Sequence, residues 1–548
     1  MNLLCPFWIN KIPRLRTDSP SALSLADLLY CNVEDPNEVW THVILGGYVI
    51  DVEWLFRVSG PLLMSKCTIV LISGEKGFLH KYRHLVLHDR FGRNRVKIVE
   101  PCLPIPFGVH HSKMMLCINN NGIRVAVLTA NFIEDDWNYK TQGIYFQDFP
   151  RLKTQSENIV LNISSIEGKG MRFRNEIKRY LSCIGVASSM PKDGCIPLSL
   201  LDEFDFSGAC VELIASVPGY HRCSDAQHYG LGKLKSILQS MQLPSSLDRN
   251  PPVLTWQFTS QGLLTANFLN SMKQIMSIDA RNPTGEDKMD PVVRVVYPTE
   301  TEVKNSLEGW RGGLSLPVTL RCCHSYINER LFRWGTVPQG SEVENERSKG
   351  LPHLKTYTRL TESEDGLSWF LLTSANLSRA AWGEWQHGGT QLLIRSYELG
   401  VLYDETSFLH VKEDGLFSVT PSRPVPIPSS ADGDGLVRVT IKADTCKKDG
   451  GGAALFLPYN PLTLQPYVST VQIQERRTNA LAERSKSPLS TTDVPWVVDV
   501  PHHGEDRFGK EFHDVLSGDN PCKEYLHASH RLSRSNSQIR KKRMKYDN

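Results

Sequence analysis

The stretch HHSKMMLCINNNGIRVAVLTAN, residues 110–131, returns in altered form as PHLKTYTRLTESEDGLSWFLLTSAN at residues 352–376. Each copy opens with a His-x-Lys tripeptide in a strand-like run, continues through a second apolar run, and ends in a turn of small residues closed by an asparagine. The spacing from histidine to asparagine is 20 residues in the first copy and 23 in the second. Because one unit occurs twice, the sequence predicts an internal duplication in which each half contributes one His-Lys-Asn set.

The similarity continues beyond the two copies. A Thr-Gln pair ending at Gln142 follows the first copy and one ending at Gln391 follows the second, in each case after a tryptophan and before an apolar run. A third His-x-Lys, at His410 and Lys412, is followed by neither element. We therefore predict that His410 and Lys412 are unrelated to the duplicated site.

The spacing within each copy gives the strand two different faces. Alternate side chains of a β-strand point the same way, so His111 and Lys113 share one face while Ser112 and Met114 share the other. The second copy has the same alternation. One face is therefore predicted to carry reactive groups and the other to join the core.

Two imidazoles, two ammonium groups and two carboxamides suit the cleavage of a phosphodiester. One histidine can act as nucleophile and the other as general acid, because histidine titrates near neutral pH. Lysines and carboxamides can hold the oxygens of a phosphoryl group as it becomes five-coordinate. This chemistry uses no metal, and we expect no cofactor. The predicted catalytic residues are His111, Lys113, Asn131, His353, Lys355 and Asn376.

Two other interpretations compete with this site. Either set alone could be an ordinary strand-end histidine with a solvated lysine, and the recurrence of both sets argues against that. A zinc site is also open, although no clustered spacing of ligands supports it. Its candidate ligands are His110, His111, His324 and His353.

Short β-branched runs alternate with helix-compatible segments along most of the chain, which predicts an α/β fold in two layered halves. Strands are expected at 67–73, 95–99, 124–129, 253–258, 291–297, 368–373 and 390–394, and helices at 51–58, 168–183, 262–276 and 326–333. The predicted domains are a flexible arm over 1–25, a first domain over 26–219, a second over 220–515 and a basic, partly disordered tail over 516–548. Residues 421–434 and 474–492 have the composition of linkers.

Composition narrows the compartment more than the substrate. The chain has 548 residues and a formal net charge of +3, which neither requires nor excludes a polyanionic partner. Its 13 cysteines contain no CxxC pair, as in reduced thiols of the cytosol or nucleus. No run of 18 apolar residues is present, so membrane spanning is not expected. The basic cluster at 540–545 fits a nuclear-import signal, a nucleic-acid contact or a solvated tail.

The two copies resemble the phospholipase D superfamily, whose members carry paired H-x-K-x4-D motifs. This chain has Ile118 and Leu360 at the two aspartate positions. Together with HHSKMM, LTANFIEDDW, KTQGIYF, PHLKTY, LTSANLSRAAWG and GTQLLIRSYELGVL, that departure closely resembles the tyrosyl-DNA phosphodiesterase family over most of 43–403.

The resemblance implies two phospholipase D-like α-β-α sandwich domains with the active site at their interface. It implies a nuclear DNA-repair enzyme that hydrolyses the bond between a DNA 3′-phosphate and a tyrosine, or another 3′ adduct. His111 would form a covalent phosphohistidine, and His353 would protonate the leaving group and later activate water. The two lysines and two asparagines would bind the phosphate oxygens.

The resemblance also assigns supporting residues. Asp136 would orient His353 and Gln142 would lie behind the site, while a carboxylate that supports the nucleophile aligns with Gln465. Substrate contacts would come from Phe107, Ser260, Ser378 and Tyr48.

The implied partners are single- or double-stranded DNA with a blocked 3′ end and a topoisomerase-derived peptide, bound by a monomer that contacts no membrane. Two rival functions are also compatible with the sequence. One is a phospholipase D-type lipid phosphodiesterase, and the other is a catalytically idle DNA-binding homologue.

Overall fold

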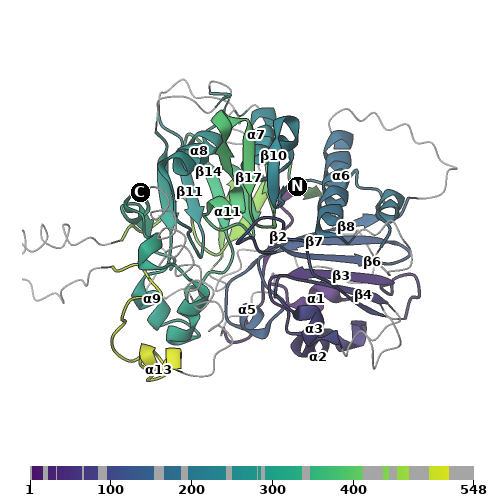
Figure 1. Ribbon diagram of the computed structural model, residues 1–548, viewed down its shortest axis with the longest axis horizontal. Coiled ribbons are helices and arrows are strands. Elements are labelled where there is room, and N and C mark those ends of the chain that lie inside the picture. Colours follow the sequence, from purple (N-terminus) through teal and green to yellow (C-terminus); the bar gives the residue numbers. More distant parts are fainter. Residues whose placement is uncertain are drawn as a thin grey trace, which may run out of the picture.

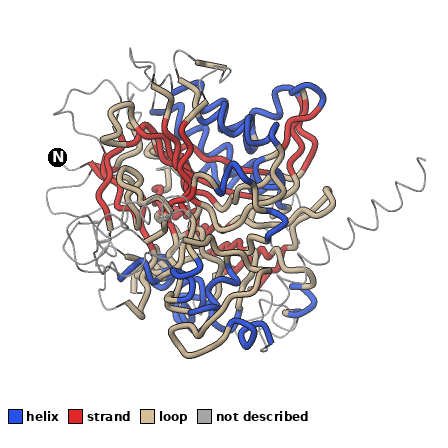
Figure 2. The backbone as a smooth tube through the Cα atoms, turned by 90° about the vertical axis from the view of Figure 1, so that its left-hand side faces the viewer, coloured by secondary structure: helices blue, strands red, loops and turns tan. Residues whose placement is uncertain are grey.

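The structure, a computed structural model, describes residues 3–15, 22–32, 34–63, 67–83, 95–152, 166–186, 196–241, 243, 250–279, 282–284, 290–335, 346–410, 436–442, 453–467 and 493–517. Strands run through the middle of the molecule, and helices lie on either side of them (Figure 2). Both predicted linkers and the basic cluster at 540–545 lie outside the described residues.

A seven-stranded sheet forms the first half, in the order β2-β8-β7-β6-β3-β4-β5. Helices α1, α2 and α3 lie on one of its faces and α6 lies on the other (Figure 1). These elements are β2 (Phe7–Ile9), α1 (Leu25–Leu29), β3 (His42–Gly47), α2 (Val52–Leu63), β4 (Thr68–Ser73), α3 (Phe78–Lys81), β5 (Val96–Val99), β6 (Lys113–Ile118), β7 (Gly122–Leu128), α5 (Glu134–Asn138), β8 (Gly143–Pro150) and α6 (Ile166–Ile184).

An eleven-stranded sheet forms the second half. Its strands are β9 (Glu212–Ser216), β11 (Val253–Gln257), β12 (Val292–Val296), β13 (Leu331–Phe332), β14 (Thr356–Leu360), β15 (Leu367–Thr373), β18 (Glu398–Tyr403), β1 (Leu3–Leu4), β19 (Leu409–His410), β20 (Val437–Ile441) and β21 (Ala453–Leu457). A separate three-stranded sheet holds β10 (Gly219–Arg222), β17 (Gln391–Ile394) and β16 (Glu384–Gln386). The helices of this half are α7 (Gly230–Met241), α8 (Ala266–Met276), α9 (Glu300–Lys304), α10 (Ser325–Asn328), α11 (Arg379–Trp382) and α13 (Phe512–Ser517), with a 3-10 turn η4 (Gly309–Ser315).

The two sheets share a strand order, which establishes the duplication in three dimensions. The first sheet runs β2-β8-β7-β6-β3-β4-β5, and the second contains β9-β18-β15-β14-β11-β12-β13 with the same parallel and antiparallel pairings. Both His-x-Lys strands, β6 and β14, therefore occupy the same place in their sheets. The chain is an α/β protein built from two similar halves, as predicted.

Side chains alternate between the two faces of β6, as predicted, but both faces join a core, so the reactive groups are confined to the start of the strand. Met114 and Leu116 pack in a core with the apolar side of α6, whereas Met115 and Cys117 pack in a second core with α1 and α2. Ser112, on the α6 face, is hydrogen-bonded to Tyr180 of that helix. The strand is thus fixed from both sides, which holds Lys113 in one orientation.

Local sequence explains where several helices begin. Thr265 caps α8 by accepting a hydrogen bond from the Phe268 N–H. Ser24 and Asp27 form a capping box at the start of α1, and Thr299 and Glu302 form one at α9. Such caps satisfy N–H groups that have no partner within the helix.

The halves meet through apolar packing between their sheets. The ring of Phe7 in β2 lies 5.3 Å from that of Phe370 in β15. A Cβ added to Gly143 would lie 2.4 Å from Leu372 Cδ1, so a larger residue at the start of β8 would displace the Leu372 side chain of the other sheet. The site at the interface is consequently built on a tightly packed boundary.

Three expectations need correction. Within the predicted flexible arm, residues 3–4 and 7–9 form strands β1 and β2. Strand β9, which lies before the expected boundary at 219, belongs to the second sheet. The helix expected over 326–333 is short, since α10 ends at Asn328 and β13 then pairs with β12.

Candidate active site

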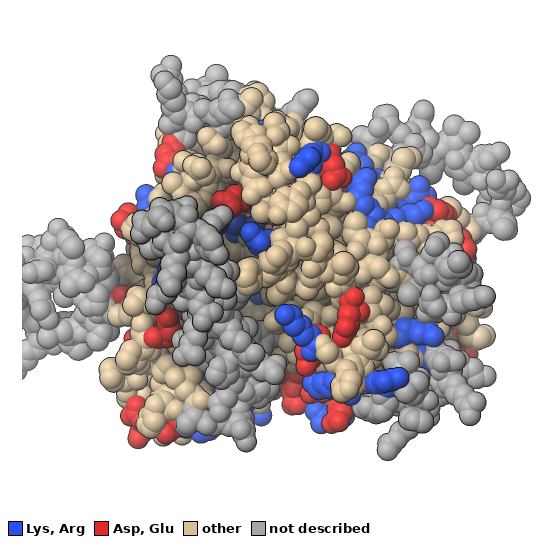
Figure 3. Space-filling view, in the orientation of Figure 1, with Lys and Arg blue, Asp and Glu red and all other residues tan. Residues whose placement is uncertain are grey.

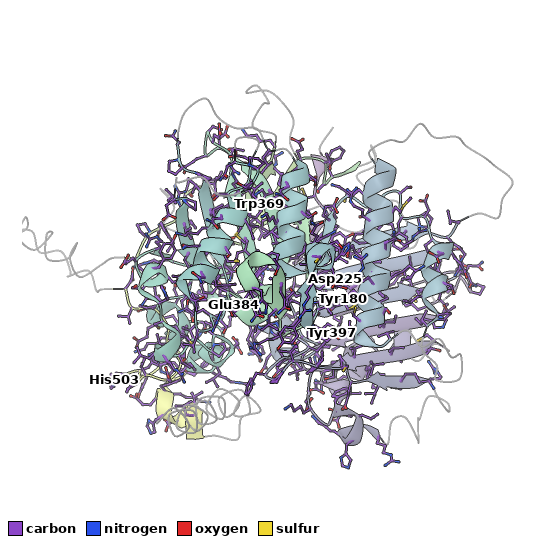
Figure 4. All side chains as sticks on the ribbon, turned by 45° about the horizontal axis from the view of Figure 1, so that its top comes forward. Tyr180, Asp225, Trp369, Glu384, Tyr397 and His503 are labelled. Atoms are coloured by element: carbon purple, nitrogen blue, oxygen red, sulfur yellow. The ribbon has the colours of Figure 1, made fainter. Side chains whose placement is uncertain are left out.

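Both His-x-Lys sets lie where the two halves meet. The His111 N–H donates to the Tyr397 carbonyl at 3.0 Å, and the His353 N–H donates to the Thr141 carbonyl at 2.8 Å. Each histidine is therefore fixed by backbone of the other half. Tyr397 and Tyr180 pack with ring centroids 6.2 Å apart at the end of α6 beside the first set (Figure 4).

The ring of His111 rests on a carboxylate that sequence reasoning missed. Glu398, the first residue of β18, lies with its Oε2 2.9 Å from His111 Nδ1 and also accepts a 2.6 Å hydrogen bond from the Ser374 hydroxyl. Its side chain is buried. The Glu398 carboxylate fixes the ring and leaves Nε2 as the nitrogen available to a substrate.

His353 has an equivalent arrangement with different chemistry. Its Nδ1 lies 3.2 Å from Gln142 Oε1, and that oxygen also accepts a 2.8 Å hydrogen bond from Thr129. Asp136 Oδ2 lies 3.5 Å from the same ring nitrogen. Gln142 and Asp136, both predicted as supporting residues, are thus brought together around His353.

The prediction that Gln465 stands where the family has the carboxylate that supports the nucleophile is wrong, because Glu398 supports His111. Gln465 is exposed, and its carbonyl accepts from the Arg333 N–H at 2.9 Å, on the far strand edge of the second sheet. The signal for Glu398 was available in the sequence, because SYELGVL places a single acidic residue at the head of an apolar strand.

The two lysines and two asparagines repeat one geometry. Lys113 Nζ donates to the His111 carbonyl and Lys355 Nζ to the His353 carbonyl, each at 2.5 Å. Asn376 Oδ1 accepts from the Thr259 and Ser260 N–H groups at 3.1 and 3.0 Å.

Asn131 Oδ1 makes the corresponding pair of contacts, at 3.2 Å to the Tyr48 N–H and 3.4 Å to the Val49 N–H. One N–H of the Asn131 amide donates to Asp136 Oδ2 at 2.9 Å. The amide oxygens of both asparagines are therefore anchored to backbone, which turns their NH₂ groups toward the site.

Burial and crowding of cations dominate the electrostatics. Burial, opposed by Glu398, lowers the pKa of Lys113 to about 8. Burial and the charge of Lys113 hold the pKa of Lys355 well below its ordinary value. Burial lowers the pKa of His111 and, reinforced by the two lysines, holds that of His353 well below its usual range. A phosphate anion between these groups would stabilise their protonated forms.

The predicted substrate contacts lie at the rim. Phe107 is 54% exposed and has a φ of 63°, a strained value for a residue with a Cβ. Tyr48 stacks obliquely on His111, with ring centroids 5.8 Å apart. Ser260 is bonded to Asn376 through its N–H, and Ser378 caps α11 two residues beyond that asparagine.

The four histidines of the zinc alternative do not form a ligand set. His324 caps α10 through its ring Nδ1, and His110 is buried against Tyr397 with a pKa lowered to about 3, mainly by burial. Within the described ranges, no three His, Cys, Asp or Glu side chains are grouped as metal ligands would be. No helix in those ranges is long and apolar enough to cross a membrane.

Charged side chains on the face shown in Figure 3 are mixed, with Lys and Arg interspersed among Asp and Glu. The small net charge of the chain agrees with this distribution.

Comparison with known proteins gives consistent results. The family model described as tyrosyl-DNA phosphodiesterase matches residues 4–468. Tyrosyl-DNA phosphodiesterase 1 of Arabidopsis thaliana is 32% identical over 482 residues, covering 85% of this chain and 71% of the relative. The Drosophila melanogaster protein of the same name is 30% identical, covering 69% of this chain and 63% of its own length. A crystal structure of the yeast tyrosyl-DNA phosphodiesterase superimposes with a TM-score of 0.51 at 19% identity, over 77% of this chain and 92% of that one.

Proposed function

The chain belongs to the tyrosyl-DNA phosphodiesterase family and is a phosphodiesterase, and from that premise we propose how its residues divide the reaction. Its substrate is DNA whose 3′-phosphate is esterified to a tyrosine or to another 3′ adduct. The observation that carries the proposal is the crossed support of the histidines, because Glu398 of the second half holds His111 and Gln142 of the first half holds His353.

In the first step, His111 Nε2 attacks the phosphorus. The bond from phosphorus to the tyrosine oxygen breaks, and His353 Nε2 gives its proton to the departing phenolate. The product is DNA joined to His111 through a P–N bond. The lowered pKa of His111 keeps its ring neutral and nucleophilic at neutral pH, and Glu398 stabilises the charge that the ring acquires.

In the second step, the now neutral His353 takes a proton from water. The resulting hydroxide attacks phosphorus, the P–N bond breaks, and DNA leaves with a 3′-phosphate. Asp136, beside the His353 ring, favours the protonated imidazole that the first step consumes and the second step regenerates. Lys113, Lys355, Asn131 and Asn376 bind the phosphate oxygens and stabilise the five-coordinate phosphorus.

The nucleic acid side of the site is assigned to Phe107. An exposed aromatic on a strained backbone, four residues before the nucleophile, suits stacking on a base near the 3′ end. Ser260 and Ser378 would bind phosphates of the strand, and Tyr48 faces the peptide adduct, which would come from a topoisomerase. The enzyme acts as a monomer, since one chain supplies both histidines.

The test uses a 3′-phosphotyrosyl single strand in the presence of a strong chelator. Wild type should release free 3′-phosphate DNA, and denaturing gels should show a transient DNA-linked protein band. His353→Ala should accumulate that band and His111→Ala should never form it. Absence of tyrosine release by wild type at any pH between 5 and 9 would contradict the proposed activity.

Nuclear localisation is part of the proposal. Its support is the repair role of the family and the basic cluster at 540–545, which lies outside the described residues. Deleting 540–545 should reduce nuclear accumulation of the tagged protein. Unchanged accumulation would remove the import role of the cluster.

A further inference from the structure

The loop that supports His353 is tied to the N-terminal strand by a single asparagine. Asn10 follows β2, and its Nδ2 donates to the Trp137 carbonyl at 2.9 Å and to the Lys140 carbonyl at 2.8 Å. Its Oδ1 accepts from the Gln142 N–H at 2.8 Å. These three bonds span the whole loop between α5 and β8.

Asn10 is itself held from both halves. It is fully buried, and its N–H donates to the Gln142 carbonyl at 3.3 Å, in continuation of the β2–β8 pairing. Its carbonyl accepts from the guanidinium of Arg347, a buried residue of the second half, at 3.3 Å. The side chain of Asn10 has no freedom to turn away from the loop.

The two groups that contact the His353 ring flank this loop, because Asp136 lies in α5 and Gln142 directly precedes β8. Gln142 Oε1 lies on Nδ1, and Gln142 Nε2 donates to the Asp136 carbonyl at 3.1 Å. Asn10 is therefore hydrogen-bonded to Gln142, and Gln142 is in turn hydrogen-bonded to His353.

The duplicated half lacks an equivalent. Ser216, the last residue of β9, pairs with Glu398 as Asn10 pairs with Gln142. A serine has no amide with which to bond two carbonyls and an N–H together. The asparagine is thus a feature of the His353 side alone.

We propose that Asn10 is a positioning residue for His353, acting through the loop at 137–142 and Gln142. The inference rests on the proposed function, because it assigns Asn10 to the histidine that serves as acid and base. Its substitution should impair steps that need proton transfer by His353 and spare attack by His111.

Two substitutions separate the contacts. Asn10→Ala removes all three side-chain bonds. Asn10→Asp keeps the shape and the acceptor for the Gln142 N–H, but it points a carboxylate oxygen at the Trp137 and Lys140 carbonyls. Both variants should slow proton-transfer steps by about 10–100-fold, as substitution of a group behind a reactive residue commonly does.

The experiment compares two leaving groups on the same oligonucleotide, tyrosine and 4-nitrophenol. The acidic nitrophenol leaves without a proton from His353. With that substrate, each Asn10 variant should release one equivalent of nitrophenol at the wild-type rate and then stall as a DNA-linked protein. With the tyrosyl substrate, formation of the DNA-linked protein should itself be slow.

Asn119→Ala is the matched control. Asn119 is also a buried asparagine with three hydrogen bonds to main chain, from the Asn121 and Gly122 N–H groups and to the Glu38 carbonyl, at the turn between β6 and β7. It should lower the melting temperature without changing the ratio of the two steps.

Equal slowing of both steps in the Asn10 variants, or a ratio matching Asn119→Ala, would overturn the positioning role. That outcome differs from failure of the proposed function, in which wild type would not turn over the tyrosyl substrate and His353→Ala would not accumulate DNA-linked protein. Faster release of DNA by either Asn10 variant would also overturn the inference.

Discussion

The two halves carry the same site on equivalent strands, and the side chains that support the two histidines differ in one atom. Where β18 of the second half presents Glu398 to His111, the equivalent position before β8 of the first half presents Gln142 to His353. A hydroxyl two residues before the asparagine holds each of them, Ser374 in one case and Thr129 in the other. Each histidine is thus held by an equivalent set of strands and side chains, which we call its frame. The exchange of a carboxylate for a carboxamide distinguishes the frame of the nucleophile from the frame of the acid.

A second difference lies behind the acid histidine. Asp136 stands five residues after Asn131, and Ala381 stands five residues after Asn376. Only the first half therefore has a buried carboxylate there, and Lys140 lies 3.8 Å from it and 3.1 Å from Glu308. Asp136, Lys140 and Glu308 form a charge cluster that links the two halves beside His353.

The largest effect should come from removing one histidine from each frame in turn. His111→Ala should lower turnover by roughly 10⁵-fold or more, because no other group can form the P–N bond. His353→Ala should leave a measurable first step with a good leaving group and trap DNA on the protein. Quantifying the DNA-linked band by denaturing gel tests the division; trapping by His111→Ala instead would reverse the assignment.

Giving both histidines the same carboxamide support should reduce activity less than removal of a histidine. Glu398→Gln places a carboxamide beneath both histidines, so the charge acquired by His111 loses its counter-ion. Formation of the DNA-linked protein should slow by about 10²-fold or more, measured in single turnover. Glu384→Gln, a carboxylate on β16 paired with Arg379, is the control and should leave this rate unchanged. A normal rate in Glu398→Gln would show that the carboxylate does not distinguish the halves.

The charge cluster can be tested through stability. Lys140→Met leaves Glu308 buried without its cation and should lower the free energy of unfolding by about 3–5 kcal/mol. Lys140→Met with Glu308→Leu removes both charges and should recover most of that loss. Chemical denaturation of the three proteins measures it. Equal stability of the single and double variants would contradict a coupled pair.

The lysines predict a pH dependence. Lys113 is protonated below its pKa of about 8 and loses its charge above it, so phosphate binding is present at neutral pH and lost as pH rises. We expect kcat/KM to fall about tenfold per pH unit above that value. In Lys113→Arg, whose guanidinium stays charged, the remaining activity should fall less steeply between pH 8 and 9.5. A flat wild-type profile to pH 10 would contradict this assignment.

The smallest effects should come from the hydroxyls that hold Glu398 and Gln142. Each hydroxyl donates a hydrogen bond to that side chain and also accepts one from a main-chain N–H, of Leu399 or of Gly143. The donated bond is worth about 1 kcal/mol, so its loss should slow one step by about fivefold. Ser374→Ala should slow formation of the DNA-linked protein, and Thr129→Ala should slow its release. Single-turnover rates for the two steps would check this, and an effect of both variants on the same step would show that the frames are not independent.

Much of this arrangement was predictable because its elements are local. The His-x-Lys pairs follow the period of a strand, and the asparagines close the next strand, so β6, β7, β14 and β15 were anticipated together with the six residues that they place. The supporting residues Gln142 and Asp136 also lie close to the first asparagine in sequence.

Glu398 was missed because its position depends on a pairing that sequence alone does not specify. The repeat of Thr-Gln at Gln391 suggested the wrong register, since β16 and β17 are inserted before β18 in the second half. Gln391 lies in the small sheet, seven residues before the true counterpart of Gln142. The Thr-Gln similarity therefore pointed to the inserted strand β17 and not to β18, which is the equivalent of β8.

The N-terminal strands were missed for a related reason. β1 and β2 have two and three residues, too short to show a period, and their partners lie far along the chain. They form strands because β2 pairs with β8 and β1 pairs with β21, and these partners are distant in sequence. No window of sequence around them contains that information.

Those two short strands also constrain how the protein folds. Leu4 pairs with Ala454 in one sheet, whereas Phe7 pairs with Tyr145 in the other. Residues 4 and 454 must therefore come together before the seam between the halves can close, and contacts so distant in sequence form slowly. A chain from which β21 is removed would keep both reactive histidines but lack one of the two strands that pair with β1, so the N-terminal residues would lose part of their attachment to the second sheet.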